Sequence, residues 1–189
     1  MILNPYQNLP ESSFWKNGVA KENPNNIKGI YRKKFDIDQS EKIAIAGSCF
    51  AQHIGYHLRK NGYSVLDTEL PPPGLPNHLR KDYGYMTYSA RYGNIYTAAQ
   101  LLQITKECCG NIQHDQISWE RGGKYFDAFR PSVEPEGLDS DEEVIEHRSY
   151  HIKRVKKVIE DMDVFIFTLG LTEHGLILQK KLYIQALLE

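Results

Sequence analysis

The strongest constraint on the fold of this chain is a short apolar run that ends in a glycine and a serine. Residues 42–46 include β-branched side chains and predict a buried parallel strand, which Gly47 and Ser48 follow. After this turn, apolar residues recur at helical spacing up to Gly62, which predicts a helix that stops there. Residues 63–66 predict a second strand. A strand, a helix and a strand joined by short links predict a parallel sheet with a right-handed crossover.

The rest of the chain predicts one long loop and several further elements. Prolines exclude regular structure from the loop, residues 67–92. Ser140 and Glu143 form a capping-box pattern that begins a helix. The predicted apolar stripe of this helix consists of Val144, Ile145, Ile152, Val155 and Ile159. The other predicted elements are a helix over residues 97–109, with Thr97 near its N-cap and Gly110 as its stop, a hairpin within residues 119–137 and a strand over residues 163–168.

These elements predict a layered α/β domain with a mainly parallel sheet. In such sheets, ligands bind beyond the carboxyl ends of the strands. Two of the predicted strands end in a polar turn that contains glycine, one at Gly47-Ser48 and one at residues 170–173. Both turns are expected at the same edge of the sheet, which makes that edge the predicted functional site.

Composition narrows the classes of function. The 189 residues suffice for one domain with a sizeable core, and the formal net charge of −1 indicates neither a nucleic-acid partner nor a membrane partner. The three cysteines show no CxxC spacing, which favours a reducing compartment over a disulfide framework. The N-terminus lacks a signal-peptide pattern, and no apolar run approaches the ~20 residues of a membrane span. We expect a cytoplasmic protein.

Ser48 is the leading candidate for a nucleophile, although its position has a simpler explanation. A serine between a buried strand and a helix projects its hydroxyl from the sheet edge, where helix N–H groups can stabilise an oxyanion. The simpler explanation is that Ser48 caps the helix. Cys49 is a rival nucleophile, because a helix N-terminus lowers the pKa of a thiol. Its side chain follows that of Ser48 by one step and can point into the core instead.

Two other segments carry candidate oxyanion or substrate groups. Gly93 and Asn94 precede a predicted helix, and a glycine N–H with an asparagine amide makes a plausible oxyanion pair. The alternative is a turn that leads into a capped helix. Glu173 follows the last predicted strand, where orienting a base, binding substrate and capping the next element are all open.

Two histidine pairs have a spacing that can bind zinc on a helix. His53 with His57, and His147 with His151, are each four residues apart. Neither pair has an obvious third ligand nearby, so an exposed or partly buried helix face is the favoured explanation. We predict no metal and no other cofactor, and the chain has no glycine-rich phosphate loop.

Residues Gly47 to Ala51 read Gly-Ser-Cys-Phe-Ala, and the blocks around them lie in a matching order. The chain thereby resembles the GSCFA family, bacterial proteins related to the SGNH (GDSL-like) hydrolases, over residues 1 to about 173. The resemblance implies a flavodoxin-like, three-layer domain that hydrolyses or transfers acyl esters of a small molecule or a carbohydrate. The other blocks are Asn4-Pro5-Tyr6 with Phe14-Trp15, residues 89–97, Phe129-Arg130-Pro131 and residues 168–173.

The resemblance also implies roles for single residues. Ser48 stands where SGNH hydrolases have their nucleophile, and Gly93 resembles the second-block glycine whose N–H faces the oxyanion. Gly170 to Glu173 resembles the third block, Gly-x-Asn-Asp, with Thr172 in place of the asparagine and Glu173 in place of the aspartate. One oxyanion donor is therefore missing from the pattern, and Asn94 is the candidate to replace it. In SGNH hydrolases a histidine takes the serine proton and passes it to the leaving group.

The fourth SGNH block, Asp-x-x-His, has no counterpart in this sequence. We therefore expect little or no activity, because members of a triad act as a unit. Residues 174–189 also stop resembling the family, and their codons read out of phase can give family-like residues. Our hypothesis is a frameshifted or prematurely ended product, which sequencing the gene beyond position 189 tests. The predicted organisation is an arm (residues 1–40), a GSCFA domain incomplete at its C-terminus (41–173) and an atypical tail (174–189).

Two functions of different classes remain open at this point. The first is a serine esterase or acyltransferase of SGNH type. The second is a non-catalytic binding module that keeps a vestigial SGNH pocket. The oligomeric state cannot be predicted from the sequence.

Overall fold

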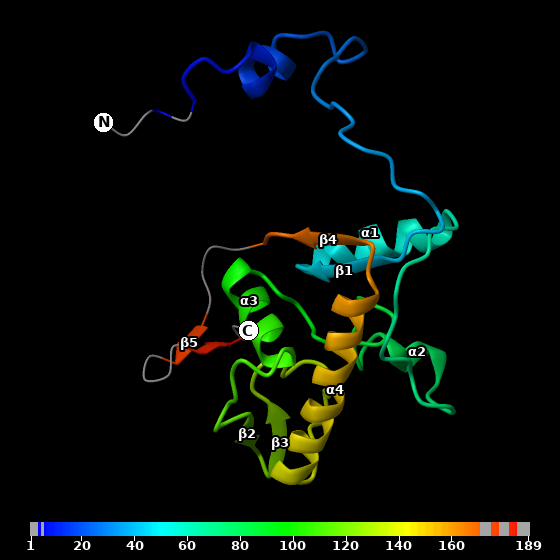
Figure 1. Ribbon diagram of the computed structural model, residues 1–189, viewed down its shortest axis with the longest axis vertical. Coiled ribbons are helices and arrows are strands. Elements are labelled where there is room, and N and C mark those ends of the chain that lie inside the picture. Colours follow the sequence, from blue (N-terminus) through cyan, green and yellow to red (C-terminus); the bar gives the residue numbers. More distant parts are fainter. Residues whose placement is uncertain (1–3, 5, 171–174, 178–181, 185–189) are drawn as a thin grey trace. The chain divides into compact units, whose positions relative to one another are not determined.

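In the computed structural model, residues 38–189 contain two paired parallel strands (Figure 1). Strand β1 (Ile43–Gly47) pairs with β4 (Val164–Thr168), from Ile43 beside Val164 to Gly47 beside Thr168. All five residues of β1 are buried. The parallel pairing confirms the prediction for these two segments. It also brings their carboxyl ends to the same edge, as expected.

The structure describes residues 4, 6–170, 175–177 and 182–184. The chain divides into two compact units, Met1–Ile37 and Asp38–Glu189. The first unit contains two short helical turns, η1 (Glu11–Ser13) and η2 (Lys16–Ala20). The second unit contains all the other elements.

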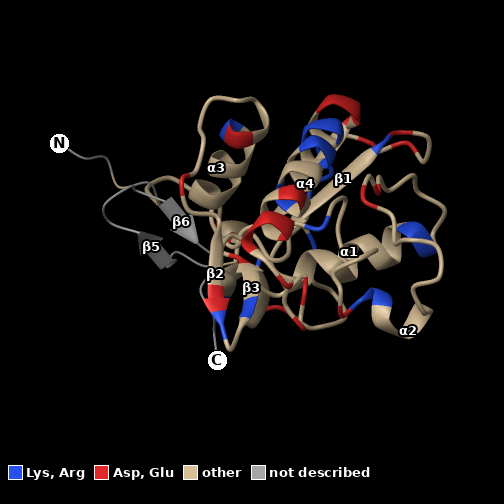
Figure 2. Cartoon of the chain, turned by 90° about the horizontal axis from the view of Figure 1, so that it is seen from below, with Lys and Arg blue, Asp and Glu red and all other residues tan. Residues whose placement is uncertain are grey.

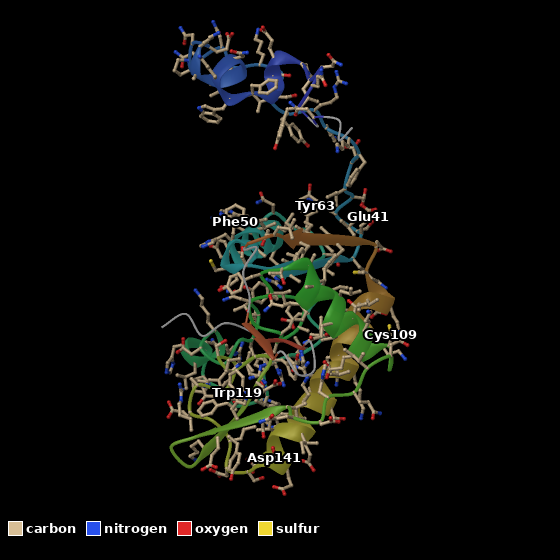
Figure 3. All side chains as sticks on the ribbon, turned by 90° about the vertical axis from the view of Figure 1, so that its left-hand side faces the viewer. Glu41, Phe50, Tyr63, Cys109, Trp119 and Asp141 are labelled. Carbon is tan, nitrogen blue, oxygen red and sulfur yellow. The ribbon has the colours of Figure 1, made fainter. Side chains whose placement is uncertain are left out.

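Helix α1 (Cys49–Lys60) begins directly after Ser48 and ends before Asn61, its C-cap, as predicted. It packs against β1 and β4. Phe50, near the start of α1, is 63% exposed rather than part of the core (Figure 3). The strand, turn and helix that carry Ser48 therefore have the predicted order and bounds.

The predicted strand at residues 63–66 is reduced to one bridge, between Val65 and Ile43. Beyond this bridge, the neighbour of β1 is a segment of the long loop. The N–H of Ser89 donates to the carbonyl of Ile45 (3.2 Å), and the Ser89 hydroxyl accepts from the N–H of Ile45 (2.8 Å). The strand prediction was too long because these groups satisfy the hydrogen-bonding positions that a longer strand would use.

The loop over residues 67–92 is not wholly irregular. It contains a short helix, α2 (Asn77–Arg80), with Pro76 at its N-cap. Proline lacks an N–H, but a helix needs no N–H from the residue before its first turn. The prediction that prolines exclude regular structure throughout this loop was therefore wrong.

Helix α3 (Ala98–Cys108) confirms the predicted helix to within one residue. Thr97 and Gln100 form a capping box at its start. The predicted hairpin is also present, with β2 (Ser118–Arg121) antiparallel to β3 (Lys124–Asp127). A second hairpin near the end of the chain consists of β5 (Gly175–Ile177) and β6 (Leu182–Ile184).

Helix α4 (Asp141–Asp161) begins as predicted, with the Ser140 hydroxyl accepting from the N–H of Glu143 (3.2 Å). Trp119 of β2 and Asp141 lie at the same end of this helix (Figure 3), where Asp141 accepts a hydrogen bond from Ser118. The buried face of α4 differs from the predicted stripe. It consists of Val144, Arg148, His151, Val155 and Val158.

The stripe was wrong because two ionisable side chains take core positions on α4. Ile145 is 45% exposed, and Ile152 and Ile159 are half-buried. Arg148 and His151 are buried in their place, and each is paired with a carboxylate. A prediction from apolar periodicity omits such residues, because unpaired ionisable groups are almost never buried.

The α/β class and the parallel sheet are confirmed. Along the described part of the chain, every helix is too short or too polar to cross a bilayer.

Candidate functional site

Ser48 occupies the N-cap position of α1, but its side chain does not cap the helix. Its hydroxyl lies 3.0 Å from the hydroxyl of Thr168, the last residue of β4. The N–H of Ser48 also donates to Thr168, to its hydroxyl (3.0 Å) and to its carbonyl (3.3 Å). The simpler explanation, that Ser48 is present as a helix cap, is therefore not the geometry observed.

Gly47 makes this arrangement possible. Its φ of +133° is disfavoured for residues with a side chain, and a Cβ there would lie 2.4 Å from the Thr168 hydroxyl oxygen. The two strands can therefore approach closely at their carboxyl ends. This close approach sets the position of Ser48 against Thr168.

The turn after β4 also reaches Ser48. A Cβ on Gly170 would lie 3.0 Å from the Cβ of Ser48 and 2.9 Å from the ring of Tyr96. The N–H of Gly170 donates to the carbonyl of Tyr96 (3.0 Å). Ile95 is tied to the first turn, because its N–H donates to the carbonyl of Gly47 (2.9 Å). Three segments far apart in the sequence thus meet at this edge: residues 47–49, 94–96 and 168–170.

Asn94 belongs to a chain of polar side chains beside Ser48. The amide of Gln52, one helical turn after Ser48, donates to the Tyr88 hydroxyl (3.0 Å). The Tyr88 hydroxyl in turn donates to the side-chain oxygen of Asn94. The side chain of Asn94 also lies beside the hydroxyl of Tyr96, where it acts to lower the pKa of Tyr96. Its amide is therefore held in one orientation from two sides.

Tyr88 and Tyr96, the two tyrosines beside Asn94, remain protonated at neutral pH. Burial raises the pKa of Tyr88 to about 12, and burial also raises the pKa of Tyr96. The nearby thiol of Cys49 acts in the same direction on both. Tyr88 is therefore a hydrogen-bond donor here, and neither Tyr88 nor Tyr96 serves as a base.

The predicted site residues are placed as follows. Cys49 is exposed at the start of α1, with its thiol near the two tyrosines rather than in the core. Gly93 is half-buried with a φ of +67°, next to the fixed Asn94. Thr172 and Glu173 lie outside the described residues, so their predicted roles stay predictions.

The histidine pairs do not form shared sites. His53 and His57 are exposed on α1. His147 is exposed and lies 3.6 Å from Glu134, whereas His151 is fully buried against Glu69 at 2.8 Å. Across the described residues, no group of three or more His, Cys, Asp or Glu side chains could hold a metal ion. The Ser48 hydroxyl has no histidine or carboxylate partner among them either.

A second polar region, which we term the buried ion-pair cluster, consists of paired ionisable side chains. Arg130 stands at its centre, and its guanidinium donates to Asp127 (2.7 Å) and lies 3.5 Å from Glu69. It also donates to the carbonyl of Arg91 (3.1 Å), which links the family blocks at residues 89–97 and 129–131. The members of the cluster are Glu69, Glu107, Asp127, Arg130, Arg148 and His151.

The buried ion-pair cluster contains the strongest pKa shifts of the acidic groups. Burial alone would raise the pKa of Glu69, but His151, Arg130 and the N–H of Arg91 lower it to about 2. Burial likewise opposes ionisation of Asp127, whose pKa Arg148 and Arg130 lower to about 2. Burial and the charge of Arg130 lower the pKa of His151 to about 4. His151 is therefore neutral and sealed from solvent at neutral pH, which excludes direct contact with a substrate.

Sequence reasoning missed several residues at the Ser48 edge. Gln52 follows Ser48 by four residues, which is the signal that places both on one helix face. Thr168 ends a strand that runs parallel to the strand before Ser48, so its position was also deducible. No sequence pattern pointed to Tyr88, because it lies in a loop and reaches the site through tertiary contacts.

Comparison with known proteins supports the family predicted from the sequence blocks. The model of the GSCFA family matches residues 42–181, a range that contains Ser48, the 89–97 block and β4. No curated protein gave a match, and no solved structure gave one either. The family match covers most of the chain. The protein belongs to the GSCFA family.

Proposed function

We propose that Ser48 is the nucleophile of an SGNH-type acyl-transfer site, acting on acyl esters. The observation that carries the proposal is the geometry of Ser48 at the N-cap of α1. Its hydroxyl bonds to Thr168 instead of capping the helix, although capping is the usual role of a serine in this position. The first-turn N–H groups of α1 and the positive end of its dipole then remain directed at the space beside the hydroxyl.

The reaction would proceed through an acyl-serine. The Ser48 oxygen attacks the ester carbonyl, its proton passes to a base, and the carbonyl oxygen becomes an oxyanion. The leaving alcohol departs with a proton, and water or another alcohol then takes the acyl group from Ser48. Oxyanion donors proposed for this chain are the N–H of Gly93 and the amide of Asn94, which Tyr88 and Tyr96 hold in place.

The proton acceptor is the part that the described residues do not supply. Thr168 is a hydroxyl and not a base, and Tyr88 and Tyr96 hold their protons. We therefore propose that this chain by itself acylates Ser48 with reactive compounds but turns over esters poorly. Losing a general base typically costs about 10²–10⁴-fold in rate.

The proposed substrates are acyl esters of a small molecule or a carbohydrate, and the proposed location is the cytoplasm. The three cysteines, Cys49, Cys108 and Cys109, are free, which suits a reducing compartment.

A fluorophosphonate probe tests the nucleophile, because it phosphonylates activated serines without needing a full catalytic cycle. Because no described residue offers a base to the Ser48 hydroxyl, we expect slow labelling that reaches one adduct per chain at long exposure, located at Ser48 by peptide mass spectrometry and lost in Ser48→Ala. Cys49→Ser is the matched control, since it changes the neighbouring nucleophile and should keep the adduct. An adduct on Cys49, or one that persists in Ser48→Ala, would remove Ser48 as the nucleophile.

A second function remains, a non-catalytic binding module with a vestigial pocket. The observation that favours it is the lack of a histidine or carboxylate on the Ser48 hydroxyl among the described residues. In that case the probe leaves Ser48 unmodified even at long exposure, while the protein stays folded. The same labelling experiment therefore separates the two functions.

A further inference from the structure

A cleft of about 480 Å³ lies between α1 and the loop that contains α2. Figure 2 shows α1 and α2 as neighbours, with Lys and Arg marked on α2. The side chains that matter for its chemistry are Gln52, His53 and Tyr56 from α1, and Asn77, Arg80 and Lys81 from the α2 loop.

The cleft has an unbalanced positive charge. Arg80 and Lys81 line it together with the imidazole of His53, and no Asp or Glu is among its lining residues. Within the described residues, Arg80 has one hydrogen bond, from Nε to the carbonyl of Leu75 at 3.4 Å, and no ion pair. The arginines of the buried ion-pair cluster are, by contrast, fully engaged with carboxylates and carbonyls. The donors of the cleft are thus available to a ligand.

The wall that carries Arg80 and Lys81 is fixed by its own hydrogen bonds. The N–H of Tyr85 donates to the carbonyl of Arg80 (2.8 Å), and the N–H of Gly84 donates to that of Lys81 (2.9 Å). Met86 then adopts a φ of +60°, which is uncommon for a residue with a side chain. Its carbonyl accepts from Arg59 (3.3 Å). Such a held conformation is typical of binding sites.

Gln52 connects this cleft to the Ser48 edge. It lines the cleft, and its amide donates to Tyr88, which holds Asn94. Gln52 lies one helical turn after Ser48 on α1, so the two side chains share a face of the helix. A substrate whose ester lies at Ser48 can therefore extend along α1 into the cleft.

We infer that the cleft binds an anionic group, a carboxylate or a phosphate, carried by the acyl ester on which Ser48 acts. The inference rests on the proposed function of Ser48. Arg80 and Lys81 supply the charge, while Asn77 and Gln52 supply neutral hydrogen bonds to the group that bears it. Tyr56 offers a ring face for the apolar side of a sugar.

Binding of three sugars to the full chain tests the charge preference. The probes are glucose 6-phosphate, glucuronate and neutral glucose, followed by chemical-shift changes in NMR spectra. We expect one or both anions to bind at least about tenfold more tightly than glucose, a difference of about 1.4 kcal/mol. The two anions distinguish a phosphate from a carboxylate. Equal binding of all three sugars would overturn the inference.

Matched double variants locate the binding. Arg80→Gln with Lys81→Gln should weaken anion binding about tenfold or more. Lys106→Gln with Lys153→Gln removes the same charge from exposed positions on α3 and α4, and should leave binding unchanged. Equal loss in both double variants would show a general charge effect and overturn the site. Thermal unfolding of each variant checks that the fold is kept.

Competition with the fluorophosphonate probe separates this inference from the proposed function. Protection of Ser48 by the bound anion supports both. Anion binding without protection of a labelled Ser48 shows that the cleft does not serve the Ser48 substrate and overturns the inference. If Ser48 never labels while the cleft binds anions, the proposed function fails and the anion site stands.

Discussion

The buried ion-pair cluster and the Ser48 edge are both polar, yet they differ in how their groups are satisfied. In the cluster, each charge faces an opposite charge or a backbone carbonyl, and Arg130 is 2% exposed. At the Ser48 edge, a half-buried hydroxyl has one hydroxyl partner, and the adjoining cleft keeps positive charge without acids. Strong pKa shifts therefore accompany structural ion pairs here, whereas donors without carboxylate partners line the proposed anion site.

Arg130→Met should produce the largest loss of stability. The substitution leaves the carboxylates of Glu69 and Asp127 buried with one partner fewer. Breaking a buried ion pair in this way typically costs about 3–5 kcal/mol. Urea unfolding measures the change.

Lys124→Met is the matched control for Arg130→Met. Lys124 pairs with Asp139 at the surface, where both side chains are largely exposed, so no measurable loss is expected. Similar stability of the two variants would show that the buried ion-pair cluster does not hold the fold.

Acid should destabilise the fold in two steps. Burial and Arg130 lower the pKa of His151 from 6.5 to about 4. Between these two pH values, His151 is protonated in the unfolded chain and neutral in the folded chain. Stability therefore falls as pH drops from about 6.5 to 4. The lowered pKa values of Glu69 and Glu107, both about 2 against an ordinary 4.5, extend the loss from about pH 4.5 to 2.

Urea unfolding at a series of pH values checks both steps. Each pKa unit between the folded and unfolded chain corresponds to about 1.4 kcal/mol. His151→Gln should flatten the upper step and reduce the Glu69 part of the lower one, because His151 helps to lower the pKa of Glu69, while the Glu107 part should remain. A wild-type unfolding free energy that does not change between pH 6.5 and 4 would contradict the neutral, buried state of His151.

The sequence predicted the elements with local signals and missed those set by distant contacts. The turn at Ser48, the helix start near Thr97 and the strand ending at Thr168 all follow from short patterns, and the structure confirms each of them. The strand near Val65 and the stripe of α4 were mispredicted. Long-range partners decide these two elements, because Ser89 completes the edge of β1 and Glu69 allows His151 to be buried.

The same division applies to the candidate site. The meeting of the two glycine turns was predictable, since parallel strands end at one edge of a sheet. The Tyr88–Asn94 hydrogen bond and the cleft beside α2 were not predictable from local patterns. Both depend on how the long loop at residues 67–92 folds back onto α1.

Thr168→Val should have a small effect on stability and a clear effect at the site. Valine keeps the shape of the side chain but removes the hydroxyl that bonds to both the N–H and the hydroxyl of Ser48. Each of the two lost hydrogen bonds costs about 1 kcal/mol of stability. The freed Ser48 hydroxyl can then rotate to cap α1, as serines at this position usually do. We expect fluorophosphonate labelling of Ser48 to slow by about tenfold, which corresponds to about 1.4 kcal/mol. Thr168→Ser restores the hydroxyl and should restore labelling, so equal labelling rates of the valine and serine variants would show that Thr168 does not position Ser48.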